Sequence, residues 1–386
     1  MKMRIAYVVN HVAFFVSHRL PLAAAALETG YNTSLFTGLA GSEEMEAAAM
    51  AQLNTFGIKH RRCVFSSSGM QPIGEFFGLL QLIWFIHRFK PDLLHCASPK
   101  GVLYGGIAAR LCRVPGLVLA ISGFGYGFTK GSKPSLLRRF VRVIYQAASG
   151  FVFTHPNIRV IVQNQDDHKH LLAKKMISPE KLVLIRGSGV DLTKFKDCNP
   201  LEKQDLIILP ARMLKDKGVE EFVVAAKFVK TKAPQWRLVL VGAAGYGNPS
   251  AITKTQLRAW EDNGDVEYLG HIEDMLPLFV KAAIVCLPSY REGMPKALLE
   301  AAAAGCAVVT TDVTGCREAI LPGITGDLVP ARDPEKLSQA LLLLIENRLK
   351  RGAYGTAGQV FAAEHFSIDS VVAKTMKIYE ELLRDG

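Results

Sequence analysis

Two glutamates in the last third of the chain have the spacing of a ligand-binding pair. Glu292 and Glu300 are separated by seven residues, and Pro295 stands between them where a helix begins. Glu292 therefore lies in the loop before the helix, and Glu300 lies inside it. The amide groups at such a helix end favour a phosphate, and carboxylates accept hydrogen bonds from hydroxyl groups. The pattern suits a sugar, a diphosphate and a ribose bound along one crevice; a capped helix with surface glutamates is the alternative.

Two successive α/β series must position such a site. Apolar runs predict strands at 4–9, 33–36, 92–96, 117–121, 160–163 and 182–185, and then at 206–211, 236–242, 266–270, 283–288 and 307–311. Helices are predicted at about 18–27, 75–89, 102–111, 135–148, 218–232 and 295–304. Apolar strands that alternate with helices are typical of parallel sheets covered on both faces. We therefore expect two α/β domains, with a boundary near 187–203.

Composition places the chain among globular proteins. It has 386 residues, of which 49% are hydrophobic and 21% charged, so disordered, collagen-like and small disulfide-rich proteins are excluded. The seven scattered cysteines form no Cys-x-x-Cys pair, and we expect reduced thiols and no zinc site. The first residues read as a strand rather than a signal peptide. The most apolar window, 76–89, is shorter than the roughly 20 residues that span a bilayer.

Charge is distributed unevenly along the chain. Residues 1–195 hold 23 Lys+Arg and 10 Asp+Glu, a net charge of +13, whereas the remainder has a net charge of −2. A basic half suggests contact with an anionic surface, which could be nucleic acid or lipid. The alternative is that these charges are simply solvated. No nucleic-acid-binding module is recognisable, so we expect no nucleic acid partner.

Other phosphate-binding motifs are absent from the sequence. The glycine-rich segments 122–128 and 242–247 do not follow the Gly-x-Gly-x-x-Gly pattern, and no Walker loop is present. No Asp-x-Asp pair is present either, so metal-dependent sugar transfer of the GT-A type is not predicted.

The segment 288–320 resembles the Glu-x7-Glu region of the family 4 retaining glycosyltransferases, which have the GT-B fold. The segment 211–226 is similar to the Arg-x4-Lys-Gly element of that family, and 366–383 to its C-terminal helix. The resemblance implies two Rossmann-like parallel-sheet domains facing a cleft. Residues 1–190 would bind the acceptor and 191–365 the nucleotide sugar, while 366–386 would return to the first domain.

The resemblance also implies roles for individual residues. Arg212 and Lys217 would neutralise the donor diphosphate, Glu292 would contact the reacting sugar, and Glu300 would hold the ribose. The remaining donor contacts would be Gly293, Met294, Pro295, Lys296, Ala297, Leu269, Gly270, His271, Ile272 and Asn10. The donor is expected to be a UDP-sugar, and no cofactor and no metal are implied.

Residues of the first half indicate which subgroup of the family the chain resembles. Many family members carry a histidine after the strand at 117–121, whereas this chain has Ser122 in the run SGFGYG. That run resembles the subgroup that elongates sugars linked to polyprenyl (undecaprenyl) diphosphate in bacterial glycan assembly, which implies transfer of GalNAc or another HexNAc or hexose. The acceptor contacts would be His11, Lys100, Ser122 and Gly123. Lys100 meets either an acceptor phosphate or solvent, and a soluble acceptor is the second enzyme hypothesis.

A lipid-linked acceptor implies a membrane surface. The predicted helix at 135–148 has an apolar face flanked by Arg138, Arg139 and Arg142, and the apolar run at 76–86 adds to it. Basic amphipathic helices lie on anionic membranes, although a core helix with a solvated basic side has the same pattern. We therefore expect a peripheral protein on the cytoplasmic face of the inner membrane.

Overall fold

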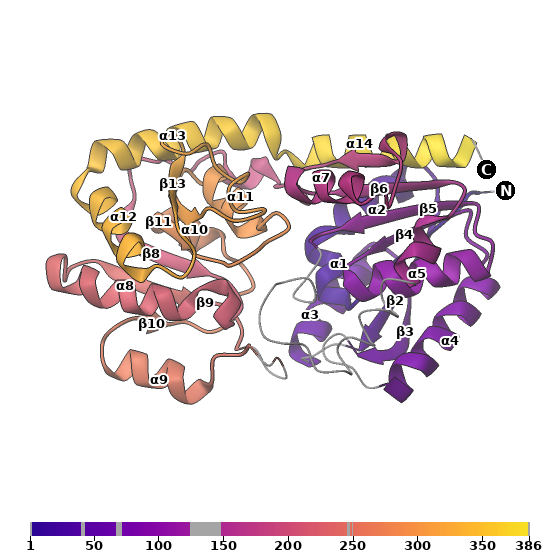
Figure 1. Cartoon of the computed structure of the whole chain (residues 1–386), viewed down its shortest axis with the longest axis horizontal. Helices are drawn as coiled ribbons and strands as arrows, with labels where there is room; N and C mark the ends of the chain where they lie inside the picture. Colours follow the sequence, from indigo (N-terminus) through magenta and orange to yellow (C-terminus); the bar gives the residue numbers. More distant parts are fainter. Residues whose placement is uncertain are drawn as a thin grey trace. The chain divides into compact units, whose positions relative to one another are not determined.

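The computed structural model describes residues 2–39, 43–66, 72–123, 148–244, 248 and 250–384. The chain divides into two compact units (Figure 1). The first comprises Met1–Ile185 and Ser370–Gly386, and the second Arg186–Asp369. Each unit is a parallel sheet with helices on both faces, which confirms the α/β prediction made from the alternating apolar runs.

In the described part of the first unit, the sheet has the order β3-β2-β1-β4-β5-β6-β7. Its strands are β1 (Arg4–Val9), β2 (Asn32–Leu39), β3 (Lys59–Ser66), β4 (Leu93–Ala97), β5 (Gly116–Ile121), β6 (Ile158–Val162) and β7 (Leu182–Leu184). The chain adds β2 and β3 on one side of β1 and then returns to place β4 on the other side. The carboxyl ends of β1 and β4 therefore flank a switch point of the kind at which α/β sheets bind ligands.

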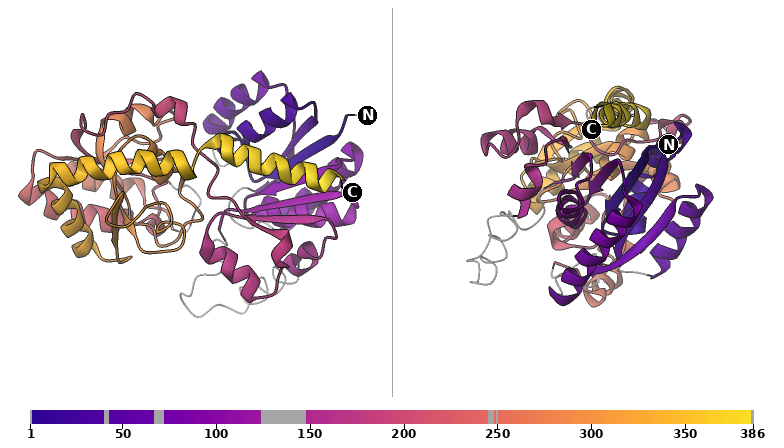
Figure 2. Two further views of the ribbon diagram at one scale, coloured as in Figure 1. Left: turned by 90° about the horizontal axis from the view of Figure 1, so that it is seen from above. Right: turned by 90° about the vertical axis from the view of Figure 1, so that its right-hand side faces the viewer.

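The helices of the first unit cover the two faces of its sheet. Their bounds are α1 (Val12–His18), α2 (Leu20–Glu28), α3 (Glu43–Thr55), α4 (Pro72–Phe89), α5 (Pro99–Leu111), α7 (Gln165–Ala173) and α14 (Ile368–Arg384). Ile5, Tyr7 and Val9 of β1 pack with α1, α2, α3 and α14, whereas Ala6 and Val8 pack with α4, α5 and α7. Both faces are buried, which explains why the strand reads as a continuous apolar run. Figure 2 shows α14 lying across this unit.

Two elements of the first unit were not predicted. The helix expected at 18–27 is α2, but the separate helix α1 precedes it, because Arg19 leaves helical geometry between the two and Pro21 lies in the first turn of α2. The strand β3 was not predicted because Lys59, Arg61 and Arg62 interrupt its apolar pattern. β3 is an edge strand, and exposed charges are how edge strands avoid pairing with other chains.

The second unit has a sheet of order β10-β9-β8-β11-β12-β13 among its described residues. The strands are β8 (Gln204–Pro210), β9 (Arg237–Val241), β10 (Glu267–Tyr268), β11 (Ala282–Leu287), β12 (Ala307–Thr311) and β13 (Gly326–Val329). The helices are α8 (Val219–Lys232), α9 (Lys254–Asp262), α10 (Leu276–Lys281), α11 (Lys296–Ala303), α12 (Pro334–Glu346) and α13 (Arg348–His365). The helices α8, α9 and α12 pack on one face and α10, α11 and α13 on the other.

None of the described helices combines the length and the apolar character needed to cross a bilayer. The predicted helix at 135–148, with Arg138, Arg139 and Arg142, lies outside the described residues except for its last position.

Candidate functional site

The site of the second unit lies at the carboxyl ends of β8 and β11. The chain runs from β8 outward to β9 and β10, and then returns to place β11 on the other side of β8. The loops that follow β8 and β11 therefore leave the same edge of the sheet at a switch point, the place at which α/β sheets bind ligands. Lys217 belongs to the first of these loops and Glu292 to the second.

An ion pair joins these two loops. Nζ of Lys217 lies 2.5 Å from Oε1 of Glu292, although the residues are 75 positions apart in sequence. The hydroxyl of Ser289 donates to the same carboxylate oxygen at 2.7 Å, and the Glu292 amide donates to the carbonyl of Thr314 at 3.0 Å. The Lys217 and Glu292 side chains are only 16% and 13% exposed. The resemblance gives Lys217 the donor diphosphate and Glu292 the adjoining sugar, and the structure places these two side chains in direct contact.

Glycines allow the loops around this pair to approach closely. Gly218 has φ of +70°, and a Cβ there would lie 2.1 Å from the carbonyl oxygen of Pro288. Gly315 has φ of +80°, and a Cβ there would lie 2.5 Å from the carbonyl oxygen of Glu292. Only glycine satisfies both the backbone conformation and the contact. The loop after β8 and the loop after β12 thus both press against the loop that carries Glu292.

Replacing Gly218 with alanine should therefore destabilise the second unit by about 3 kcal/mol or more, because strain and a backbone clash coincide. The matched control is Gly264→Ala. Gly264 has φ of +71° but no atom within 4 Å of its Cβ position, so only the conformational cost of about 1–2 kcal/mol applies. Urea unfolding followed by tryptophan fluorescence measures both. Equal effects for the two variants would show that the contact with Pro288 does not hold the loops together.

The helix α11 begins beside this pair. Pro295 is its N-cap residue, and Glu300 lies on the second turn, where Nζ of Lys296 is 3.5 Å from Oε1 of Glu300. Burial raises the pKa of Glu300 above its usual value, and the positive charge of Lys296 opposes this only in part. A ligand hydroxyl that donates a hydrogen bond to this buried carboxylate would stabilise its charged form.

The other predicted donor residues of the second unit lie around the same edge of the sheet. Arg212 follows β8 directly and its side chain is exposed. Met294 is 8% exposed and packs in the hydrophobic core, so this side chain supports the loop. In the loop after β10, the Leu269 amide donates to the carbonyl of Leu240, and the Gly270 carbonyl accepts from the Gly242 amide. His271 is exposed and Ile272 is half-buried, with Ile272 packed against the core.

The first unit has a polar network at its own switch point. The Ser98 hydroxyl donates to the side-chain Oδ1 of Asn10 at 2.6 Å, and the backbone amide of Asn10 donates to Oγ of Ser98 at 2.9 Å. Ser98 has φ of +69°, a value that few residues other than glycine adopt. His11 follows as the N-cap of α1, with Nδ1 accepting from the Phe14 amide. Asn10 and His11 are thus held at the carboxyl end of β1, where a ligand would be met.

Lys100 contacts a buried carboxylate, so its charge is not simply solvated. Its Nζ lies 2.7 Å from Oε1 of Glu75 and donates to the carbonyl of Ser66 at 2.7 Å. The Tyr104 hydroxyl donates to the other oxygen of Glu75 at 2.7 Å. Glu75 is 9% exposed, so this network offsets the cost of burying its charge. The sequence alone could not find the network, because Glu75 and Lys100 come from different helices.

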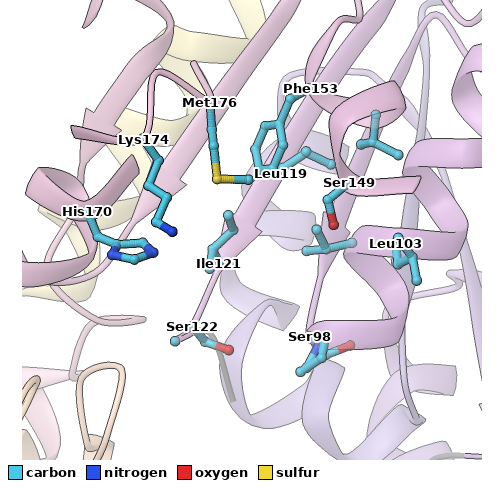
Figure 3. A pocket seen from close by; sticks show the side chains of 14 residues that line it. Ser98, Leu103, Leu119, Ile121, Ser122, Ser149, Phe153, His170, Lys174 and Met176 are labelled. Atoms are coloured by element: carbon cyan, nitrogen blue, oxygen red, sulfur yellow. The ribbon is translucent and has the colours of Figure 1, made fainter. Parts of the chain in front are cut away.

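Ser122 and Gly123 line a pocket of about 220 Å³ in the first unit. Figure 3 shows apolar side chains on its inner walls and two basic side chains, His170 and Lys174, beside one another at one side. The apolar walls include Leu103, Leu119, Ile121, Phe153 and Met176, and the polar groups include Ser98 and Ser149. His170 and Lys174 were not predicted, since nothing in the pattern of α7 distinguishes them from surface residues.

His95 is a core histidine. It is 1% exposed, and its Nδ1 lies 2.8 Å from the hydroxyl of Tyr379 in α14. Burial lowers the pKa of His95 well below its usual value, and the charge of Arg19 lowers it further, so the ring is neutral. No cluster of three or more candidate metal ligands occurs among the described residues.

Family models match both halves of the chain. Residues 4–155 match a model described as glycosyl transferase 4-like, and residues 204–347 match one described as glycosyl transferases group 1. The two matches cover most of both units.

Two curated relatives act on lipid-linked sugars by name. An N,N'-diacetylbacillosaminyl-diphospho-undecaprenol alpha-1,3-N-acetylgalactosaminyltransferase of Campylobacter jejuni is 28% identical over 350 residues, which cover 86% of this chain and 89% of that protein. A UDP-Gal:alpha-D-GlcNAc-diphosphoundecaprenol alpha-1,3-galactosyltransferase of Escherichia coli is 25% identical, over 72% of each chain.

Solved structures share the fold. HepE of Anabaena, in complex with UDP and glucose, has a TM-score of 0.77 and 16% identity, covering 98% of this chain and 99% of that one. Sucrose-phosphate synthase of Thermosynechococcus elongatus also has a TM-score of 0.77, with 17% identity over the whole of both chains. These similarities and the two sheets confirm the GT-B fold.

Proposed function

Since this chain is a glycosyltransferase of the group 1 and 4-like families, we propose that it transfers a sugar from a UDP-sugar to a saccharide carried on polyprenyl diphosphate. The observation that carries the proposal is the contact between Lys217 and Glu292 at the switch point of the second unit. It supplies a cation for a leaving diphosphate and a carboxylate for sugar hydroxyls within one small volume.

The donor would lie along the carboxyl edge of the second sheet. Lys217 and the exposed Arg212 would neutralise charge on the diphosphate as it grows, since a point charge and a planar fork together suit phosphate oxygens. The N-terminus of α11 adds a favourable dipole for the same group. Glu292 would accept from hydroxyls of the reacting sugar. Glu300 would accept from the ribose, and the loop at 269–272 would meet the base through its backbone.

The reaction exchanges one bond at the anomeric carbon for another. The bond to the β-phosphate oxygen breaks, and a bond to an acceptor hydroxyl oxygen forms on the same face of the sugar. The hydroxyl proton goes to the β-phosphate oxygen of the departing UDP, which keeps the electron pair of the broken bond. The described residues of the donor site provide charge and orientation in this scheme, and the proposal requires no metal ion.

The acceptor would bind the first unit. Ser122 and Gly123 border the apolar pocket, and Lys174 offers a cation beside it. An apolar cavity with a basic side suits a diphosphate joined to a hydrocarbon chain. The relatives that act on undecaprenol-linked sugars support this choice of acceptor.

A panel of donors tests the proposal. UDP- and GDP-sugars, with UDP-GalNAc among them, are incubated with a short polyprenyl-diphosphate-linked sugar, and the product is detected by mass. We expect transfer from a UDP-sugar to the lipid-linked acceptor. Sucrose-phosphate synthase shares the fold, so fructose 6-phosphate and free sugars serve as soluble acceptors in parallel. Turnover with these and none with the lipid-linked sugar would favour the soluble-acceptor hypothesis.

Glu300→Gln should weaken UDP binding about tenfold or more, because a hydrogen bond to a charged acceptor is worth roughly 1.5–3 kcal/mol. The raised pKa of Glu300 has two further consequences. UDP affinity of the unmodified protein should fall as pH decreases through this raised pKa. The folded state binds the proton more tightly than the unfolded state, so the charged carboxylate costs stability at neutral pH.

The Gln variant should accordingly be as stable as the parent protein, or more so, at pH 7.5. Calorimetric titration with UDP and thermal unfolding measure the two quantities. The exposed Glu346 provides the control, since Glu346→Gln should change neither. Unchanged UDP affinity in Glu300→Gln would refute the ribose assignment.

A further inference from the structure

The helix α4 of the first unit has a thin buried face. Gly78, Leu82 and Ile86 pack onto the sheet, and Gly78 lies so close to β3 that a Cβ there would be 2.5 Å from the Phe65 amide nitrogen. This close packing anchors the helix over the edge of the sheet (Figure 1). The orientation of its outer face is therefore well defined.

The outer face of α4 is apolar and exposed. Ile73 is 76% exposed, Phe76 60%, Phe77 55%, Leu80 45% and Trp84 56%. Their spacing of three and four residues places them in one stripe along the helix. Soluble proteins rarely expose a continuous apolar stripe of this kind unless another surface contacts it.

Cations lie at the C-terminal end of α4 and on the neighbouring strand β3. The guanidinium of Arg88 lies 5.9 Å from the centre of the Trp84 ring, and Lys90 follows the end of α4. On the adjacent edge strand β3, Lys59 and Arg61 share the face of Cys63, which packs with α4. Both are exposed.

The described residues of β3 and α4 hold far more basic than acidic side chains. Within the described residues of β3 and α4, Glu75 is the one acidic residue, and Lys100 and Tyr104 bind its carboxylate in the interior. This surface therefore combines exposed aromatic side chains with exposed basic side chains.

We propose that the α4 stripe (Ile73, Phe76, Phe77, Leu80 and Trp84), together with Lys59, Arg61, Arg88 and Lys90, docks the first unit on an anionic lipid bilayer. Tryptophan and phenylalanine enter the interfacial region, and arginine and lysine meet lipid phosphates. The purpose of the docking rests on the proposed function, since a lipid-linked acceptor reaches the enzyme from a bilayer. The docking itself requires no donor and no acceptor.

Sedimentation with vesicles tests the surface directly. The parent protein should bind vesicles of phosphatidylcholine with 30% phosphatidylglycerol more tightly than vesicles of phosphatidylcholine alone. Phe77→Ser combined with Trp84→Ser should lower the partition coefficient by about two orders of magnitude, since burial of one large apolar side chain is worth roughly tenfold or more. The control is Ile324→Ser combined with Leu349→Ser, which removes two apolar side chains exposed on the second unit. Equal binding by the two double variants would overturn the proposal.

A conservative variant avoids dependence on folding. Trp84→Phe keeps the apolar character of the stripe, so vesicle binding should persist. Vesicles that contain brominated lipid should quench part of the tryptophan fluorescence of the parent protein, and Trp84→Phe should lose that part. The other two tryptophans belong to the second unit, where Trp236 is 2% exposed and Trp260 is half-buried, and their fluorescence is the background common to both proteins. Identical quenching in both proteins would show that Trp84 does not enter the bilayer.

Two further measurements separate this inference from its alternatives. If the parent protein binds vesicles but transfers no sugar to a lipid-linked acceptor, the proposed acceptor fails and the docking surface stands. If the Phe77/Trp84 variant keeps its turnover on a short soluble acceptor and loses it on vesicle-borne acceptor, both stand.

Sedimentation velocity tests whether a second copy of the chain, rather than a bilayer, covers the α4 stripe. A dimer that the double variant abolishes, without vesicle binding by the parent, would replace the lipid assignment.

Discussion

Glu292→Ala should lower kcat about 100-fold or more and leave the affinity for UDP within about threefold of the parent value. One carboxylate oxygen of Glu292 accepts hydrogen bonds from both Lys217 and Ser289, and Glu292 lies in the loop that precedes α11. In the proposed arrangement it holds hydroxyls of the reacting sugar, which UDP lacks. Its loss should therefore affect the transfer step more than nucleotide binding. Steady-state kinetics and calorimetric titration with UDP measure the two effects.

A neighbouring carboxylate provides the control for this prediction. Asp312 follows β12 at the same edge of the sheet, but its side chain is 58% exposed and its ion pair with Arg317 lies on the surface. Asp312→Ala should leave kcat nearly unchanged, since exposed ion pairs contribute little. Near-normal turnover by Glu292→Ala would remove Glu292 from the site.

Lys217→Ala should lower kcat by about 100- to 1000-fold, the range observed when one group that stabilises transition-state charge is removed. Lys217→Arg should restore only part of the loss. The variant replaces the compact ammonium that contacts Glu292 with a larger, planar guanidinium of different hydrogen-bond geometry. Since the proposed mechanism uses this cation in place of a metal, a chelator should leave the activity of the parent protein intact.

A double-mutant cycle distinguishes the two roles that Lys217 can have. If Lys217 acts only by holding Glu292, the double alanine variant should be no slower than Glu292→Ala alone. If Lys217 also stabilises the departing diphosphate, its removal should slow the Glu292→Ala variant further. We expect the second result. A double variant as active as Glu292→Ala would assign Lys217 a positioning role alone.

Much of the fold could be predicted because its strands are buried on both faces. Apart from Arg4 at the start of β1, β1 and β5 consist of apolar residues, and their runs identified them without reference to any partner. β3 escaped prediction because it lies at an edge, where Arg61 and Arg62 face solvent. The helix α1 escaped prediction because it is only seven residues long and ends where the backbone leaves helical geometry at Arg19, a residue that favours helices.

The candidate site shows the same division between local and distant information. The spacing of Glu292 and Glu300 and the helix start at Pro295 are local features. The sequence by itself therefore determined that Glu292 precedes α11 and that Glu300 lies within it. The contact between Lys217 and Glu292 depends on the position of β11 beside β8, and no feature of either loop reveals that strand order.

The first unit depended on tertiary structure to an even greater extent. A lysine at the start of a helix reads equally well as a phosphate ligand or a solvated charge, and the packing of α4 beside α5 assigned Lys100 to Glu75. The exposure of Phe77 and Trp84 was decided in the same way, because an apolar helix buries whichever face its sheet can cover. The sequence alone determined that α4 is apolar on several sides. Only the packing of Gly78 against Phe65 determined which side remains exposed to solvent.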